Sequence, residues 1–369
     1  MNVIERNFMS LLRCGTFGDD TPTEPMSHWK WDYLFQMSMM HGVPALVYDG
    51  IKSREGEFFL NITDRQRKKW EETVDETERD NRRMIEATAM LFDTLNGQHT
   101  RPIMLKGQAL ASIYKQPLHR QGGDCDIFFP LGPQWDKAEG WARHNGGGIV
   151  SPDRWTLQYE WHGLKVEHHR RMLKLTNILF NKRLQNIIDA EIRCCDSTYI
   201  YINNVKIETL SPTLNLLYGM VRIAKYILND GVSLKQVIDL GMMLRKIGDK
   251  VDFVKLQSWI EQLGMTDMAQ LEGSLLKGLF NFSIDEIPFM SDKKSDDISS
   301  ITHEIFRMKG NHTYDWYFTQ GKNVFVSTSN KSAMMWHVNN SRRFFRYYPS
   351  ETFTNFFTSF AHSISHIEE

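Results

Sequence analysis

The sequence predicts an α+β fold in which a small mixed sheet with its own helices is flanked by helical regions on both sides. Residues 101–129 read as an apolar run, a glycine turn, a short helical stretch and a second apolar run, which is typical of a strand–helix–strand unit. Two alternating runs joined by His162-Gly163 indicate a β-hairpin. From residue 209 onward, apolar residues recur at helical spacing. The sheet is therefore expected in the middle of the chain.

Length and charge limit the classes of function. The 369 residues suffice for two or three domains with sizeable cores. The 44 Lys and Arg residues balance 45 Asp and Glu residues, so the overall charge requires neither nucleic acid nor an anionic membrane as a partner. The four cysteines, Cys14, Cys125, Cys194 and Cys195, match neither a disulfide framework nor a zinc pattern.

A membrane partner is not expected. The first 15 residues lack the apolar run of a signal peptide. No apolar stretch approaches the roughly 18–20 residues that span a bilayer. We expect a soluble, cytoplasmic protein.

Residues 1–97 predict an N-terminal helical region. The segment 27–41 is expected to form a helix with Ser27 as its N-cap, and Pro44 is expected to begin a second, short helix. A charge-rich segment begins at Asp64 and gains a clear apolar face in its second half. This pattern predicts a long helix with one solvated face.

Residues 98–208 carry the pattern with the most chemical content. The first strand is followed by Lys106-Gly107 and a short helix, and the second strand carries Asp124 and Asp126. Residues two apart share one face of a strand, so both carboxylates are expected to point the same way. Their repulsion is commonly relieved by a hard cation such as Mg²⁺, and a glycine turn before a helix offers N–H groups to a phosphate. These features fit phosphoryl or nucleotidyl transfer.

The hairpin supplies a third carboxylate. After a helix predicted from Pro133, the second hairpin strand places Lys165, Glu167 and His169 on one face and His168 on the other. Glu167 could complete a metal site or act as a base toward a hydroxyl, and the alternative is an exposed residue paired with Lys165. We expect His168 in the core and His169 nearer to the site.

Residues 209–285 predict a helical domain that closes over the cleft. Ser211-Pro212 is a cap followed by proline at the first helical position, which is a strong start signal. Asp239 lies in an apolar helical run and is expected to pair structurally. Further helices are expected at 232–246, 252–264 and 267–280.

Residues 286–369 form a C-terminal region without a predicted fold. The polar stretch 291–300 is expected to be a mobile loop. The segment 341–348, SRRFFRYY, mixes arginine with aromatic residues. It could stack nucleic-acid bases, but a helix rim is the commoner arrangement of such residues.

The motif of residues 105–126 resembles the nucleotidyltransferase superfamily whose best-known member is DNA polymerase β. It is more closely similar to a bacterial group of uncharacterised nucleotidyltransferases. The LKG…LA…Y…P…R…GD-x-D core of that group is matched by Leu105-Lys106-Gly107, Leu110-Ala111, Tyr114, Pro117, Arg120 and Gly123-Asp124-Cys125-Asp126. A later acidic-plus-histidine strand is matched by Val166-Glu167-His168. Flanking helices look similar as well, so the resemblance covers about residues 27–245.

The resemblance implies a nucleotidyltransferase-type core and Mg²⁺-dependent transfer of a nucleoside monophosphate from NTP to an acceptor hydroxyl, with release of pyrophosphate. It implies that Asp124, Asp126 and Glu167 are the catalytic residues and ligate two Mg²⁺ ions. Where the downstream helix of the group often carries histidines, this chain has Arg222 and Tyr226.

The same resemblance implies the nucleotide contacts. Gly107 and Gln108 would bind the β- and γ-phosphates through backbone N–H groups, or form a simple turn. Lys106 would reach a phosphate or pack at the strand end. Arg120 would stabilise the triphosphate or brace an aspartate. Lys225 would close the cleft from the helical domain, or be a solvated helix lysine.

The acceptor and two functional alternatives stay open. The acceptor is unknown, and a small molecule or a protein is favoured over RNA because RNA binding normally requires a concentrated basic face. The fold could instead serve as a protein-binding or regulatory module with little catalysis. The same site could also move the γ-phosphate as a phosphotransferase. The oligomeric state, base preference and pathway are not predicted.

Overall fold

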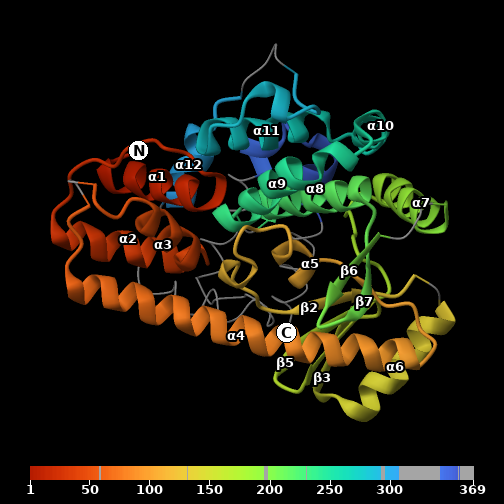
Figure 1. Ribbon diagram of the computed structural model, residues 1–369. Helices are drawn as coiled ribbons and strands as arrows, with labels where there is room; N and C mark the ends of the chain where they lie inside the picture. Colours follow the sequence, from red (N-terminus) through yellow and green to blue (C-terminus); the bar gives the residue numbers. More distant parts are fainter. Residues whose placement is uncertain are drawn as a thin grey trace, which may run out of the picture.

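The structure of the chain is a computed structural model, and it describes residues 1–57, 60–130, 132–194, 198–229, 231–291, 296–306, 341–355 and 357. It combines a mixed seven-stranded sheet with helices on both sides of it in the sequence. Figure 1 shows one long helix, α4, running past both the N-terminal helices and the sheet. The predicted α+β class is confirmed.

The N-terminal region is helical, as expected. Its helices are α1 Val3–Phe17, α2 His28–Met40, α3 Pro44–Ser53 and α4 Asp64–Gly97. Helices α2, α3 and α4 begin within one residue of Ser27, Pro44 and Asp64, because each start carries a residue suited to an N-cap or first-turn position. Helix α1 was not predicted as a separate element, although Asn2 and Glu5 form a capping box at its start.

The sheet has the strand order β3-β4-β5-β2-β1-β7-β6. Strand β1 is antiparallel to β2 and parallel to β7, and β2 is parallel to β5, so the sheet is mixed as predicted. It is larger than expected because β3 and the β6–β7 hairpin were not predicted. The strands are β1 Ile103–Met104, β2 Cys125–Phe128, β3 Gly147–Asp153, β4 Thr156–Trp161, β5 Leu164–His169, β6 Thr198–Ile202 and β7 Val205–Thr209.

Helices connect the strands of the sheet, and a second set of helices follows the last strand. The connecting helices are α5 Gln108–Ala111, η1 Pro117–His119, α6 Gly132–Asn145 and α7 Ile178–Cys194. The C-terminal helices are α8 Pro212–Asn229, α9 Leu234–Ile247, η2 Gly248–Lys250, α10 Phe253–Gln262, α11 Thr266–Phe280, η3 Ile284–Glu286 and α12 Ser299–Phe306. Among the described helices, none is both long enough and apolar enough to cross a bilayer.

The expectations for the C-terminal region have mixed outcomes. Of the predicted loop 291–300, residues 292–295 lie outside the described part, and Ser299 already begins α12. In the segment 341–348 the rings of Phe344, Tyr347 and Tyr348 are buried in the core. Buried rings cannot stack on nucleic-acid bases, so that interpretation of these three residues is wrong.

Buried apolar residues form two clusters. The larger cluster joins the N-terminal helices to α8–α11, and the smaller one lies between the sheet, α6 and the second half of α4. Helix α4 contributes to both: Trp70 and Val74 pack in the first, and Leu91, Phe92 and Leu95 pack in the second. A buried side chain of this size stabilises the fold by about 1.5–3 kcal/mol.

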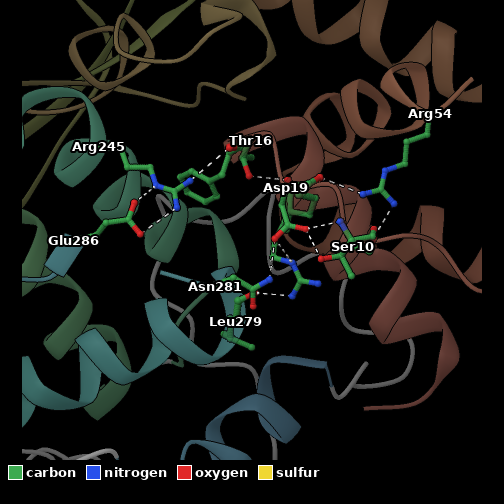
Figure 2. Close-up of polar contacts among 12 residues, drawn as sticks. Ser10, Thr16, Asp19, Arg54, Arg245, Leu279, Asn281 and Glu286 are labelled. Atoms are coloured by element: carbon green, nitrogen blue, oxygen red, sulfur yellow. Dashed lines mark hydrogen bonds and ion pairs between the residues drawn. The ribbon is translucent and has the colours of Figure 1, made fainter. Parts of the chain in front are cut away.

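Polar contacts fasten the N-terminal helices to the C-terminal ones (Figure 2). Asn281 Nδ2, just after α11, donates to Asp19 Oδ2 at 2.8 Å. Arg54 Nη2 donates to the Asp19 carbonyl oxygen at 3.2 Å, and Arg13 Nη1 donates to the Leu279 carbonyl oxygen at 3.3 Å. The end of α11 is therefore held against the segment that follows α1.

Helix α4 also holds the loop that leads into β2. Asn81 Nδ2 donates to the carbonyl oxygens of Leu118 at 2.6 Å and Arg120 at 3.1 Å, while the Gly122 N–H donates to Asn81 Oδ1 at 3.1 Å. Asn81 is 2 % exposed, so these hydrogen bonds are shielded from water. One side chain thus fixes the backbone on both sides of Arg120.

A histidine adds an ionic contact to the same loop. His119 Nδ1 lies 2.8 Å from Asp49 Oδ2 on α3, and its Nε2 lies 3.0 Å from Glu78 Oε1 on α4. Burial lowers the pKa of His119, but hydrogen bonds and charge from Asp49 and Glu78 outweigh it and raise this pKa above 6.5. The protonated ring therefore bridges two helices.

We expect replacement of His119 by Asn to remove a pH-dependent part of the stability. Because the folded-state pKa is raised, the contribution is complete below the unfolded pKa of about 6.5 and is lost as the pH rises through the folded pKa. Urea unfolding from pH 5.5 to pH 9 measures it. His144→Asn, at an exposed position, is the control, and an equal pH dependence in wild type and His119→Asn would contradict the bridge.

Candidate functional site

Two carboxylates and one ammonium group meet where β1 and β2 lie side by side. Lys106 follows β1, and its Nζ lies 3.0 Å from Asp124 Oδ2 and 2.8 Å from Asp126 Oδ2. Both carboxylates therefore point to the same side, as the sequence spacing predicted. Strand β2 begins at Cys125, however, so Asp124 precedes the strand instead of lying in it, and its side chain is the more exposed of the two.

Strand β5 adds two ligand-type side chains. Asp126 and Glu167 are paired in the parallel register of β2 and β5, and His169 lies two residues further along β5. His169 Nε2 is 2.9 Å from Asp126 Oδ1 and 3.6 Å from Glu167 Oε2. One ligand atom from each of the three residues lies within 4.8 Å of the others. The structure thus brings the predicted Asp126 and Glu167 together and adds His169.

Alternation along β5 sorts its two histidines as expected. His168 points into the core, where its Nε2 lies 2.8 Å from the Tyr159 hydroxyl. Glu167 and His169 face the other side, and Gln158 Nε2 on β4 donates to Glu167 Oε1 at 2.7 Å. The Gln158 contact holds one oxygen of Glu167, and the other oxygen, Oε2, lies on the side of His169.

Charge and burial set the protonation of the cluster. Burial raises the pKa of Asp124, but the charge of Lys106, aided by Arg222 and Lys235, outweighs it and holds this pKa at about 2. Burial lowers the pKa of His169 to about 4, against the opposing charge of Glu167. At neutral pH the carboxylate is ionised and the imidazole is neutral, which are the forms that ligate metal ions.

These residues fit a divalent cation. Asp126 Oδ2 is buried and accepts no hydrogen bond, but it forms an ion pair with the Lys106 ammonium group. A positive charge is thus already held between Asp124 and Asp126. Carboxylate oxygens with an imidazole nitrogen form a donor set used for divalent metals, and Mg²⁺ takes the oxygens.

The glycine turn adjoins the same carboxylates. Gly107 has φ +69°, a left-handed value that favours glycine, and a Cβ there would lie 3.2 Å from the Asp124 carbonyl oxygen. Gln108 is the first residue of α5 and is buried. The turn therefore brings the backbone close to Asp124, and a side chain at position 107 would be strained.

Arg120 lies behind this turn instead of pointing at the carboxylates. Its Nε and Nη2 donate to the two carboxylate oxygens of Asp239 on α9 at 2.7 and 2.8 Å. Its Nη1 donates to the Gly107 carbonyl oxygen at 3.2 Å, and the Tyr114 hydroxyl donates to Asp239 Oδ1 at 2.6 Å. Arg120 thus braces an aspartate, which was one of its two predicted roles, and that aspartate is Asp239. The predicted structural pairing of Asp239 is confirmed.

Helices α8 and α9 supply further cations. Arg222 on α8 and Lys235 on α9 both lower the pKa of Asp124. Arg222 Nη2 donates to the Tyr226 hydroxyl at 3.3 Å, and Lys235 Nζ donates to the Gln121 carbonyl oxygen at 2.7 Å. Lys225, the cation chosen from the sequence, is half-buried on α8, three residues after Arg222.

Three of these residues, His169, Arg222 and Lys235, were not chosen from the sequence as site residues. His169 lies on the same face as Glu167, and that alternation was the available signal. Arg222 is spaced four residues from both Tyr218 and Tyr226, so the three share one face of α8. A helical face that carries Tyr218, Arg222 and Tyr226 beside a carboxylate site could have been preferred to Lys225.

Comparisons with known proteins were made for the whole chain. A family profile described as uncharacterised nucleotidyltransferase matches residues 27–281, which is more than half of the chain. A crystal structure of an antigenic nucleotidyltransferase-like protein from Paracoccidioides brasiliensis is 15% identical, with a TM-score of 0.36, and the match covers 53% of this chain and 91% of that one. Among curated proteins, none matches.

We expect Asp239→Asn to destabilise the protein by about 3 kcal/mol or more, because the buried Arg120 guanidinium would lose its counter-charge. Chemical denaturation measures the change. Asp189→Asn is the control, since Asp189 lies 3.7 Å from Arg193 in an exposed pair worth less than about 1 kcal/mol. Equal losses in the two variants would contradict a role for the buried pair.

Proposed function

The chain belongs to the family of uncharacterised nucleotidyltransferases, and on that premise we propose that it transfers a nucleoside monophosphate from NTP to an acceptor hydroxyl. The observation that carries the proposal is the convergence of Asp124, Asp126, Glu167 and His169 on a site bordered by Lys106 and a glycine turn. We place the chain, as its motif suggests, with the bacterial members of the DNA polymerase β-like superfamily.

The carboxylates are proposed to hold Mg²⁺. Asp126 and Glu167, with Asp124 beside them, would provide the oxygen ligands of two ions, and His169 is in reach of the same position. Mg²⁺, when bound, neutralises phosphate charge and lowers the pKa of an attacking hydroxyl. Lys106 would then exchange a carboxylate contact for a phosphate contact.

The nucleotide contacts are proposed from the same geometry. The backbone at Gly107 and Gln108 would bind the β- and γ-phosphates, because glycine at this positive-φ turn places no side chain beside its own backbone. Lys225 on α8 would close the cleft over the nucleotide. Arg120 would act as a positioning residue, since it holds the Gly107 carbonyl oxygen and Asp239 at once.

The proposed step balances without a further reactant. The acceptor oxygen forms a bond to the α-phosphorus, and the bond from the α-phosphorus to the bridging oxygen breaks. Pyrophosphate leaves with that electron pair. The hydroxyl proton passes to a base, for which Glu167 lies on the same face as the other ligands.

Localisation and domain division are part of the proposal. We place the protein in the cytoplasm, as the sequence suggests. We propose a helical region at 1–97, a catalytic core at 98–208 and a helical domain at 209–285 that closes the cleft. Residues 286–369 form the remaining region, to which we assign no role.

We expect one NTP to raise the melting temperature of the protein only in the presence of Mg²⁺. Binding to the folded state alone contributes about 2.7 kcal/mol at a hundredfold excess over Kd. Asp126→Asn should lose this shift, because it removes a buried ligand oxygen. Asp93→Asn, which changes an exposed carboxylate on α4, should keep it. If every NTP fails well above millimolar concentration, the protein-binding or regulatory alternative is favoured.

Product analysis separates the two transfer reactions. Incubation with the NTP that binds should release pyrophosphate if the nucleotidyl group moves. Nucleoside diphosphate as the product would instead show transfer of the γ-phosphate and would contradict the proposal. Phosphate chromatography of the reaction measures both products in one sample.

A further inference from the structure

Four basic side chains surround one tryptophan ring at the end of the hairpin. Relative to the centroid of the Trp155 ring, Arg171 Cζ lies at 3.9 Å, Arg154 Cζ at 4.6 Å, Arg170 Cζ at 5.7 Å and Lys174 Nζ at 5.9 Å. We name these five residues the Trp155 cluster. Cation–π attraction brings each charge to the ring, and the four like charges repel one another.

The cluster has few carboxylates of its own. Lys174 pairs with Asp153. For Arg154, Arg170 and Arg171, the part of the chain that the structure describes places no carboxylate oxygen within 4.0 Å of the guanidinium nitrogens. Arg154 and Arg170 are exposed, and Arg171 is half-buried. A compact set of four cations, of which only Lys174 has a carboxylate partner among the described residues, is suited to binding an anionic partner.

The cluster begins where the candidate site ends. Arg170 directly follows His169, and the Arg170 N–H donates to the Trp155 carbonyl oxygen at 2.8 Å. The neighbouring residue pair along the same ladder is Thr156 with His169. One residue of strand spans about 3.3 Å, so the Arg170 backbone lies directly beyond His169 at the end of β5, and alternation turns the two side chains to opposite sides of the strand.

We propose that the Trp155 cluster binds the phosphates of a single-stranded nucleic acid that is the acceptor in the transfer reaction. This inference rests on the proposed function, because it assigns the acceptor of that site. Three of the four cations are arginines, whose planar guanidinium groups match phosphate in a bidentate manner and stack on aromatic rings. Phosphate contacts of this kind position a strand, and aromatic rings among them are typical of single-strand binding.

The inference differs from the expectation that RNA is disfavoured. That expectation used the balanced charge of the whole chain, whereas binding depends on the local density of cations. In the sequence, Arg154, Arg170, Arg171 and Lys174 stand on both sides of the hairpin, and the fold brings them to one ring.

Fluorescence anisotropy with a labelled single-stranded RNA of mixed sequence tests the binding step in the full-length protein. The variant carries Arg154→Gln, Arg170→Gln and Arg171→Gln. We expect its affinity at 100 mM salt to fall about tenfold or more. We also expect the slope of log K against log salt to shrink by about 2, since each phosphate contact contributes about 0.7. A DNA strand of the same sequence determines whether the 2′-hydroxyl contributes.

A matched control changes the same number of charges elsewhere. Arg65→Gln, Arg79→Gln and Arg83→Gln remove three exposed arginines from α4. Equal weakening in both variants, or failure of wild type to bind either strand, would overturn the inference. The melting shift with NTP and Mg²⁺ should survive in the Trp155-cluster variant. Its loss would show that the cluster binds the donor triphosphate instead.

Transfer to the strand is tested separately from binding. With the NTP that shifts the melting temperature, wild type should lengthen the labelled strand, which gel electrophoresis resolves. Asp126→Asn should bind the strand with unchanged affinity and leave its length unchanged. If wild type binds the strand without lengthening it, and transfers the nucleotidyl group to another acceptor with release of pyrophosphate, the acceptor assignment is overturned and the proposed function stands.

Discussion

The buried ion pair between Arg120 and Asp239 is the interaction on which the site geometry depends. It joins the loop before β2 to helix α9, and through the Gly107 carbonyl oxygen it also holds the glycine turn. Two charges removed from water stabilise a structure only when their geometry is close and their remaining hydrogen-bonding groups are satisfied. Tyr114 and Gly107 supply those additional hydrogen bonds here. The glycine turn, the loop before β2 and helix α9 are therefore held together by one polar network.

The candidate site also pairs carboxylates with cations. Lys106 lies between Asp124 and Asp126, and the charges of Arg222 on α8 and Lys235 on α9 lower the pKa of Asp124. The free protein thus holds the Asp124 and Asp126 carboxylates in place by an ion pair with Lys106, without any ligand. A site with this arrangement is preorganised, since its side chains need little reordering when the cations that balance them are exchanged.

The sequence predicts those parts of the molecule whose signals are local. Ser211-Pro212 marks the start of α8, His162-Gly163 marks the hairpin turn, and the spacing of Asp124 and Asp126 places both carboxylates on one side. The turn of the β6–β7 hairpin is Asn203-Asn204, both with positive φ. That asparagine pair is a usable turn signal, but two short strands alone cannot be assigned to a sheet without their partners.

Contacts that form only in the folded chain could not be predicted from the sequence. Arg120 and Asp239 are far apart in sequence, and no local pattern shows that one is the partner of the other. The same holds for Arg222 near Asp124, because the approach of α8 to the sheet is set by packing of the whole larger core. Sequence patterns thus identified the strand-borne carboxylates, while the surrounding cations depended on tertiary structure.

Helix α4 has a consequence for how the protein unfolds. Its 34 residues run without interruption from one hydrophobic cluster to the other, with Asn81 holding the site loop between them. A helix of this length, about 50 Å, packs in both clusters, so the loss of either cluster removes part of its packing. We expect the two cores to unfold as one cooperative unit, with the slowest amide exchange in both following the same global opening.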